Sequence, residues 1–248
     1  MKNTNDFELH YDLAEEMNSQ ELVEIHIGDV NLPTGRIIVS DPFFSLEQRP
    51  FSRTVEPDKY PVFIYVSQID AAHHRIAYAK IKFRPEEPKT WILALTDDLT
   101  NEELTDLGED EFYGFPIESG LACFLDEETN TRFVAKLDEL QEKNPESNYY
   151  DDVLSEEFMA YSGKNNFSRE LGDWNDHKPD ADSDNNVIMF ASGWGDGYYP
   201  AYWGITENGD LAELTIDFLL SEFDPEGGDD EEEDEEDTTE QGNNLKIV

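Results

Sequence analysis

SGWGDGYYPAYWGITENGDLAELTIDF, residues 192–218, ends in two apolar runs, 201–206 and 211–218. The segment between them contains Asn208-Gly209, and an Asn-Gly pair between apolar runs is the strongest short signal for a β-hairpin. Residues 187–191, directly before this stretch, form a continuous apolar run that is typical of a buried strand. We therefore expect the C-terminal part of the domain to be antiparallel β-structure.

Further strands are predicted upstream, from alternation of apolar and polar residues and from short apolar runs. Short connections between these strands favour an antiparallel meander, because parallel crossovers need a dozen or more residues. Apolar residues at helical spacing predict helices over 126–143 and 150–161, whereas 162–186 is expected to be a loop. His73-His74 is expected to lie in a turn. The predicted upstream strands are 22–28, 36–40, 62–66, 75–83 and 90–95. The expected fold class is α+β, with a mostly antiparallel β-sheet core and two or three flanking helices.

The chain is strongly acidic. Its 248 residues include 17 Lys and Arg against 59 Asp and Glu, a formal net charge of −42, while 38% are hydrophobic, so a sizeable core can form. A run of nine acids at 229–237 repels itself and cannot bury apolar surface. We therefore predict an N-terminal segment over 1–19, one domain over 20–222 and a disordered acidic tail over 223–248.

The net charge also restricts the partners and, with the cysteine content, the location. A protein this negative is repelled by nucleic acid phosphates and by anionic lipid, so neither nucleic acid nor membrane is an expected partner. A basic protein is the expected macromolecular partner, because opposite potentials speed association. The single cysteine, Cys123, allows no intrachain disulfide, and no apolar stretch has signal-peptide or membrane-spanning length. The expected location is the cytoplasm.

The predicted binding site is residues 192–204, which we call the glycine-aromatic segment. Glycines this dense permit backbone conformations that a Cβ forbids, and the aromatic rings can lie against a ligand. Two alternatives stand beside this interpretation: Asp196 can cap its own turn, and alternate aromatic residues can belong to the core. The candidate binding residues are Trp194, Gly195, Asp196, Gly197, Tyr198 and Tyr202, followed by Glu118 and Asp41.

The sequence contains no complete catalytic, metal or cofactor motif, so no catalytic residue and no cofactor is assigned. Alternate acids at Asp180, Asp182 and Asp184 begin like a calcium loop. Asn185, however, stands where that loop needs glycine, and Ala191 where it needs glutamate. We expect a solvated acidic loop there, with at most weak calcium binding.

Three stretches resemble the motifs of a bacterial protein family. Residues 27–42, IGDVNLPTGRIIVSDP, are similar to its opening motif, and residues 113–126, YGFPIESGLACFLD, to its central motif. Residues 192–218 are similar to its closing motif, a Ser-Gly-x-Gly-Asp-Gly-x-Tyr segment followed by a hairpin. The family is the bacterial domain-of-unknown-function 4241 family, whose function is not established. The resemblance supports the domain boundaries and the choice of site but implies no chemistry.

Three functions are compatible with these observations. The first, which the charge favours, is an acidic cytosolic binding or inhibitory protein, such as a bacterial toxin-immunity protein that neutralises a basic effector. The second is a metal-dependent enzyme in which carboxylates such as Asp196, Glu118 and Asp41 converge. The third is a module that binds a small ligand or a peptide at the glycine-aromatic segment.

Overall fold

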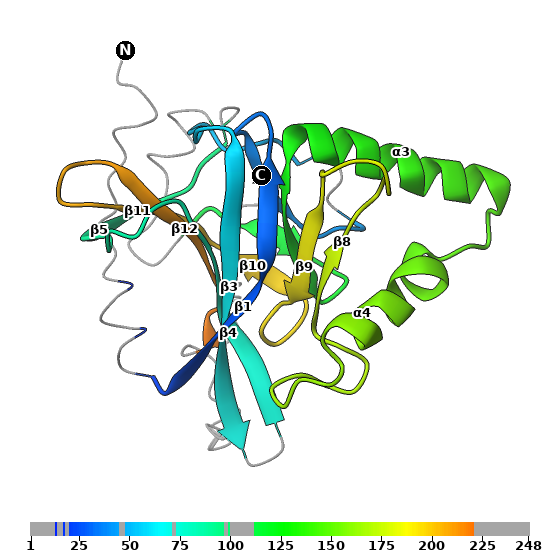
Figure 1. The fold of residues 1–248 in the computed structure, drawn as a ribbon. Coiled ribbons are helices and arrows are strands. Elements are labelled where there is room, and N and C mark those ends of the chain that lie inside the picture. The colour runs from blue at the N-terminus through cyan, green and yellow to red at the C-terminus, as the bar shows by residue number, and fades with distance from the viewer. Residues whose placement is uncertain are drawn as a thin grey trace, which may run out of the picture.

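Two antiparallel β-sheets pack face to face, with helices on the outer side of the smaller sheet (Figure 1). The computed structural model describes Leu13, Met17 and residues 20–44, 48–70, 73–96, 99 and 112–220. Most of the predicted N-terminal segment and the predicted acidic tail lie outside these residues. None of the described helices is long and apolar enough to cross a membrane.

The larger sheet has six strands in the order β1-β3-β4-β12-β11-β5, and every neighbouring pair is antiparallel. The hairpin predicted from Asn208-Gly209 is confirmed. Its turn places Gly209 at φ +86°, a conformation that favours glycine, and Thr206 N–H donates to Asp210 O at 2.9 Å. The six strands are β1 (Leu22–Leu32), β3 (Asp58–Asp70), β4 (His73–Lys82), β5 (Thr90–Leu93), β11 (Ala201–Ile205) and β12 (Leu211–Asp217).

The smaller sheet has four strands in the order β2-β7-β9-β8, and a short ladder joins β6 to β10. Successive side chains of a strand point to opposite faces. In β7, Ala122 and Phe124 belong to the cluster between the sheets, whereas Cys123 and Leu125 belong to the cluster beneath the helices. Both faces are covered, which is why this strand is apolar throughout. The strands are β2 (Ile37–Ser40), β6 (Phe115–Ile117), β7 (Leu121–Asp126), β8 (Trp174–His177), β9 (Val187–Ala191) and β10 (Gly197–Tyr199).

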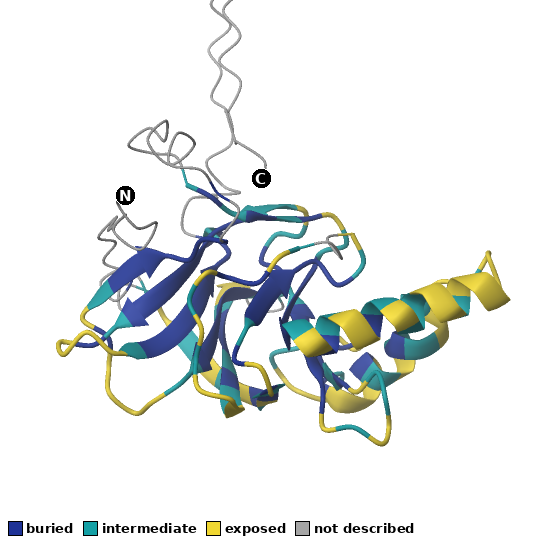
Figure 2. Cartoon of the chain, turned by 90° about the horizontal axis from the view of Figure 1, so that it is seen from above, coloured by how far each residue is buried: buried dark blue, intermediate teal, exposed yellow. Residues whose placement is uncertain are grey.

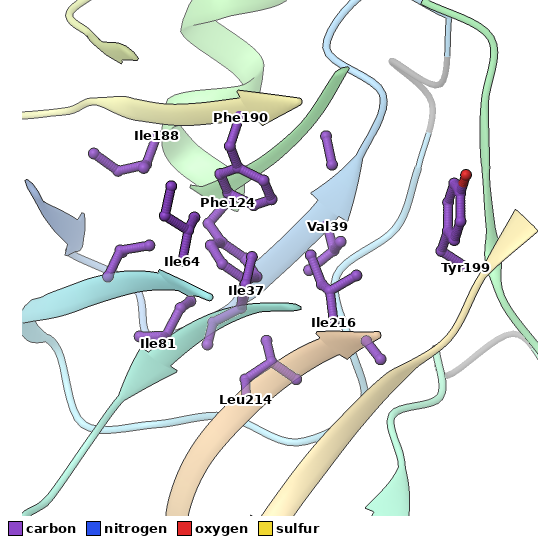
Figure 3. Packing of buried hydrophobic residues seen from close by; sticks show 14 of the residues in the cluster. Ile37, Val39, Ile64, Ile81, Phe124, Ile188, Phe190, Tyr199, Leu214 and Ile216 are labelled. Atoms are coloured by element: carbon purple, nitrogen blue, oxygen red, sulfur yellow. The ribbon is translucent and has the colours of Figure 1, made fainter. Parts of the chain in front are cut away.

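The main core lies between the two sheets. Ile64 and Leu214 from the larger sheet meet Phe124 and Ile188 from the smaller one (Figure 3). The rings of Phe124 and Phe190, on neighbouring strands, have centroids 5.1 Å apart. These side chains are fully or almost fully buried, so the interface between the sheets provides most of the apolar burial.

The helices cover the outer face of the smaller sheet. They are α3 (Glu127–Lys143), the short π-helix η2 (Tyr150–Leu154) and α4 (Ser155–Tyr161). Asp126 caps α3, because its carboxylate accepts from Glu128 N–H at 2.8 Å. Phe133 and Phe158 are buried against the sheet, while much of the remaining helix surface is exposed (Figure 2).

The α+β class and the antiparallel pairing are confirmed, but the expected meander is not. β2 leaves the larger sheet and pairs with β7, so the strands divide between two sheets. β8 lies inside the predicted loop 162–186 and forms the edge of the smaller sheet. His73 and His74 lie in β4 rather than in a turn. The predicted helix 150–161 is present, but its first turn is the π-helix η2.

A buried ion pair lies on the outer face of the larger sheet. Lys80 Nζ contacts Glu213 Oε1 at 3.0 Å, and the two side chains are 7% and 2% exposed. The same carboxylate oxygen accepts from Trp91 Nε1 and from Thr215 Oγ1, both at 3.1 Å. Lys80 Nζ also lies 5.0 Å from the ring centroid of Tyr65. The pair is therefore satisfied on both sides, as a buried charge requires.

Candidate functional site

Two loops from distant parts of the sequence lie side by side because the strands that flank them pair. β7 pairs with β9, and β6 pairs with β10. The loop 118–120 between β6 and β7 is therefore held next to the turn 192–196 between β9 and β10. Ser192 N–H donates to Gly120 O at 3.1 Å and joins the two. The central and closing motifs of the sequence meet at this point.

The turn 192–196 is fixed by its own hydrogen bonds. Gly195 N–H donates to Ser192 O at 2.6 Å, and Gly195 O accepts from Ser192 Oγ and from Tyr199 Oη, both at 2.9 Å. Glycine is required at two positions. Gly193 has φ +43° and a Cβ there would lie 2.8 Å from Phe218 Cβ, while Gly195 has φ +110°.

Asp41, a predicted binding residue, is a structural anchor instead. It follows β2, is fully buried, and uses both carboxylate oxygens for backbone N–H groups. Oδ1 accepts from Phe43 and Phe44 at 2.8 and 3.2 Å. Oδ2 accepts from Glu118 and Ser119 at 2.9 and 2.7 Å. A ligand cannot reach this carboxylate, which instead ties the segment after β2 to the loop 118–120.

These segments border a groove of about 840 Å³. This volume is within the range of small-molecule sites. Its walls come from the segment after β2, the loop 118–120, the C-terminal half of α3 with residues 147–150, and the turn 192–195. The lining includes Phe43, Phe44, Arg75, Ser119, Gly120, Asp138, Leu140, Gln141, Tyr149, Tyr150, Arg169, Trp194 and Gly195.

Tyr149, in the wall between α3 and η2, is held in place by a chain of hydrogen bonds. Its Oη lies 3.0 Å from His177 Nε2, and His177 Nδ1 lies 2.9 Å from Glu157 Oε2. His177 is 3% exposed. Burial and the charge of Glu157 raise the pKa of Tyr149 to about 12, so its hydroxyl stays protonated at neutral pH. One ring nitrogen of His177 thus faces Glu157 and the other faces Tyr149.

Two arginines lie in the groove. Arg75, on β4, has its guanidinium 5.2 Å from the ring centroid of Trp194. Arg169 follows α4, and its Nε contacts Asp173 Oδ1 at 2.6 Å. Burial, and then the positive charge of Arg169, lower the pKa of Arg75.

The remaining candidate residues are divided between surface, strand and core. Trp194 and Gly195 line the groove. Asp196 is exposed, and no described residue donates a hydrogen bond to its carboxylate, so the expected turn cap is not seen. Gly197 and Tyr198 pair with β6. None of these three residues lines the groove, and Asp41 does not line it either. Glu118, which is exposed, and Tyr202, which is a core residue in the cluster on the outer face of the larger sheet, also lie outside the groove.

The acids proposed for a metal do not converge. Asp180 pairs with Arg132 and Lys136 at 3.6 and 3.1 Å, and Asp184 pairs with Lys59 at 3.1 Å, whereas Asp182 is exposed. Among the residues that the structure describes, no group of three or more His, Cys, Asp or Glu could hold a metal ion.

Cys123 is fully buried, and its Sγ lies 3.3 Å from Ser40 O. Burial raises the pKa of this thiol to about 12, so the thiolate is disfavoured at neutral pH.

The chain can be assigned to a protein family by its match to a family model. A model described as "Protein of unknown function (DUF4241)" matches residues 30–216. The chain belongs to the DUF4241 family. No curated protein and no solved structure matches the chain.

The three motifs that resemble the DUF4241 family come together at the groove. The opening motif supplies Asp41, the central motif supplies the loop 118–120, and the closing motif supplies the turn 192–196. The DUF4241 match thus spans every segment of this junction, although the family description names no chemistry.

Sequence reasoning missed the two arginines and the tyrosine. Arg75 lies in an ordinary alternating strand, and Arg169 lies in a segment predicted to be a loop. The one usable signal was the scarcity of basic residues. With 17 basic residues against 59 acidic ones, each Lys or Arg can be examined for a carboxylate partner.

Proposed function

We propose that this protein is a binding protein whose ligand site is the groove between the turn 192–195, the loop 118–120 and α3. This proposal depends on one observation: three separate segments of the chain border the same groove. Asp41 and the pairing of β6 with β10 and of β7 with β9 hold these segments in place. Rigid turns around a concave, partly aromatic surface are typical of sites for small ligands.

Filling the groove is expected to weaken ligand binding. Gln141 is an exposed α3 residue that lines the groove, and its neighbour Glu142 is equally exposed but does not line it. We expect fragments found by ligand-observed NMR on the full chain to bind Gln141→Trp at least about tenfold more weakly, because the indole occupies their space. Glu142→Trp should bind them as the wild type does.

Two results would overturn the groove as ligand site. One is that no fragment binds the wild-type chain at millimolar concentration. The other is that the fragments which bind are equally insensitive to Gln141→Trp and to Glu142→Trp. Both variants alter exposed side chains on one helix, so both should melt within a few degrees of the wild type.

A second candidate function, inhibition of a basic effector, is favoured by the charge pattern of η2 and α4. Along α3, basic residues alternate with acids and pair with them, as in Arg132–Glu128 and Lys143–Glu139. From 144 to 163 there is no Lys or Arg, while Asp151, Asp152 and Glu156 are exposed. An ordered acidic surface of this kind suits a cationic partner.

The test compares two neutralised chains of equal charge. Asp151→Asn/Asp152→Asn/Glu156→Gln removes three acids from η2 and α4, and Glu231→Gln/Glu232→Gln/Glu233→Gln removes three from the acidic run. With an oligolysine peptide as probe, we expect the first triple variant to lose more affinity than the second, and the loss to shrink at high salt. Equal losses would show that the net charge alone attracts the probe.

A further inference from the structure

The groove collects positive charge in a chain that is otherwise acidic. Several described cations elsewhere contact carboxylates: Lys59 contacts Asp184 at 3.1 Å and Arg84 contacts Asp210 at 3.0 Å. Arg75 and Arg169 instead lie close enough for the charge of one to lower the pKa of the other. Asp173 pairs with Arg169, and its charge also raises the pKa of Arg75, so one carboxylate faces two guanidinium groups. A second anion beside the two arginines is therefore favourable.

No ion pair joins Arg75 to a carboxylate of the described residues, and Asp173 acts on it through its charge alone. Arg75 Nε is buried and makes no hydrogen bond with any described residue, and its recorded contact is with the Trp194 ring. A buried donor without a hydrogen bond destabilises a folded protein. An oxyanion that accepts a hydrogen bond from this guanidinium would balance its charge.

Arg169 is fixed and accessible. Its backbone N–H and its Nε both donate to Asp173, at 2.7 and 2.6 Å, and its side chain is 63% exposed. Within the described part of the chain, no acceptor is paired with its two terminal nitrogens. These terminal nitrogens form the fork that binds carboxylate or phosphate with two hydrogen bonds.

A hydroxyl and two glycines complete the polar side of the groove. Ser119 Oγ is buried and has no hydrogen-bond partner among the described residues. A Cβ at Gly195 would meet nothing within 4 Å, and one at Gly120 would meet only Gly195 Cα, at 3.9 Å. The backbone here faces open space, so a ligand can approach it closely.

The remaining lining is mostly aromatic and apolar. Phe43, Phe44, Tyr149 and Leu140 contribute it, and Phe44 is 62% exposed. The acid in the lining, Asp138, lies on α3, whereas both arginines lie on other elements. An anionic group is therefore favoured beside the arginines, and an apolar body beside the rings.

We infer that the groove binds a small molecule in which a carboxylate or phosphate is joined to an aromatic or other apolar body. The oxyanion contacts the guanidinium groups of Arg75 and Arg169 and the hydroxyl of Ser119. This inference rests on the groove being the ligand site.

The test is calorimetric titration of the full chain with phenylacetate, phenyl phosphate and phenylacetamide, the neutral isostere of phenylacetate. Because the amide cannot form the charge-assisted hydrogen bonds of the carboxylate, it should bind at least about tenfold more weakly. Arg75→Gln and Arg169→Gln should each weaken binding of the anions at least about tenfold. Whichever of the two anions binds more tightly identifies the oxyanion.

The matched control is Arg36→Gln, because Arg36 pairs with Glu127 at 2.7 Å and does not line the groove. It removes the same charge and should change the affinity less than about twofold. Arg75→Lys keeps the charge and should retain more affinity than Arg75→Gln, even if both are somewhat less stable.

The inference is wrong if the amide binds as tightly as the anion, if neither anion binds, or if Arg36→Gln weakens binding as much as the groove variants. Neutral fragments that bind and are blocked by Gln141→Trp would still leave the proposed function standing.

Discussion

Asp41→Asn is expected to lower the free energy of unfolding by roughly 3–4 kcal/mol. The carboxylate is fully buried and accepts hydrogen bonds from four backbone N–H groups, two in its own turn and two in the loop 118–120. An amide of the same size has one acceptor oxygen, so its NH2 group must face two donors. Chemical denaturation of the full chain measures the loss.

The control is Asp196→Asn, a change of the same kind at an exposed position near the same groove. Because no described residue donates a hydrogen bond to Asp196, we expect its stability to change by less than about 0.5 kcal/mol. If Asp41→Asn lowered the free energy of unfolding as little as Asp196→Asn, Asp41 would not be the anchor of the groove wall. The prediction that Asp41 contacts a ligand would then be favoured again.

Glu213→Gln is expected to destabilise the protein by about 3–5 kcal/mol. It leaves Lys80, whose side chain is 7% exposed, as a buried charge without its counter-ion. Lys80→Met should have a similar effect, because it leaves the Glu213 carboxylate buried with only Trp91 and Thr215 as donors. Urea denaturation of the two single variants tests both expectations.

The double variant Lys80→Met/Glu213→Gln completes the cycle. With both charges removed, the loss should be well below the sum of the single losses, since buried pairs are often replaced by neutral residues at little cost. Additive losses would mean that the two side chains act independently and that their 3.0 Å contact does not contribute to stability.

The parts of the fold that depend on local patterns could be predicted from the sequence. The hairpin at Gly209 follows from turn chemistry, and α3 follows from Phe133, Leu137 and the capping residue Asp126. The division into two sheets could not be predicted. β2 and β7 are short apolar runs buried on both faces, and such runs carry no sign of which strand they pair with. β8, with the sequence WNDH, is an edge strand. Its residues are mostly polar, so the sequence shows no apolar pattern that would predict a strand there.

The candidate site was located more easily than its chemistry. Glycine density pointed to the turn 192–196 because positive φ angles favour glycine. The contributions of Arg75 and Arg169 depend on tertiary packing, which brings β4 and the segment after α4 to one groove. The interpretation of Asp41 failed for the same reason. An Asp-Pro pair after a strand is typical of an exposed turn, and only the fold brings the N–H groups of Glu118 and Ser119 onto its carboxylate.

The central claim is that the groove joining the three motif segments is the ligand site of this protein. Backbone amide NMR of the full chain, titrated with phenylacetate, tests it most directly. We expect the largest shift changes at residues 118–120 and 192–195, with smaller ones at Phe43 and Phe44. Saturable shift changes that cluster on other elements and leave these segments unmoved would contradict the account.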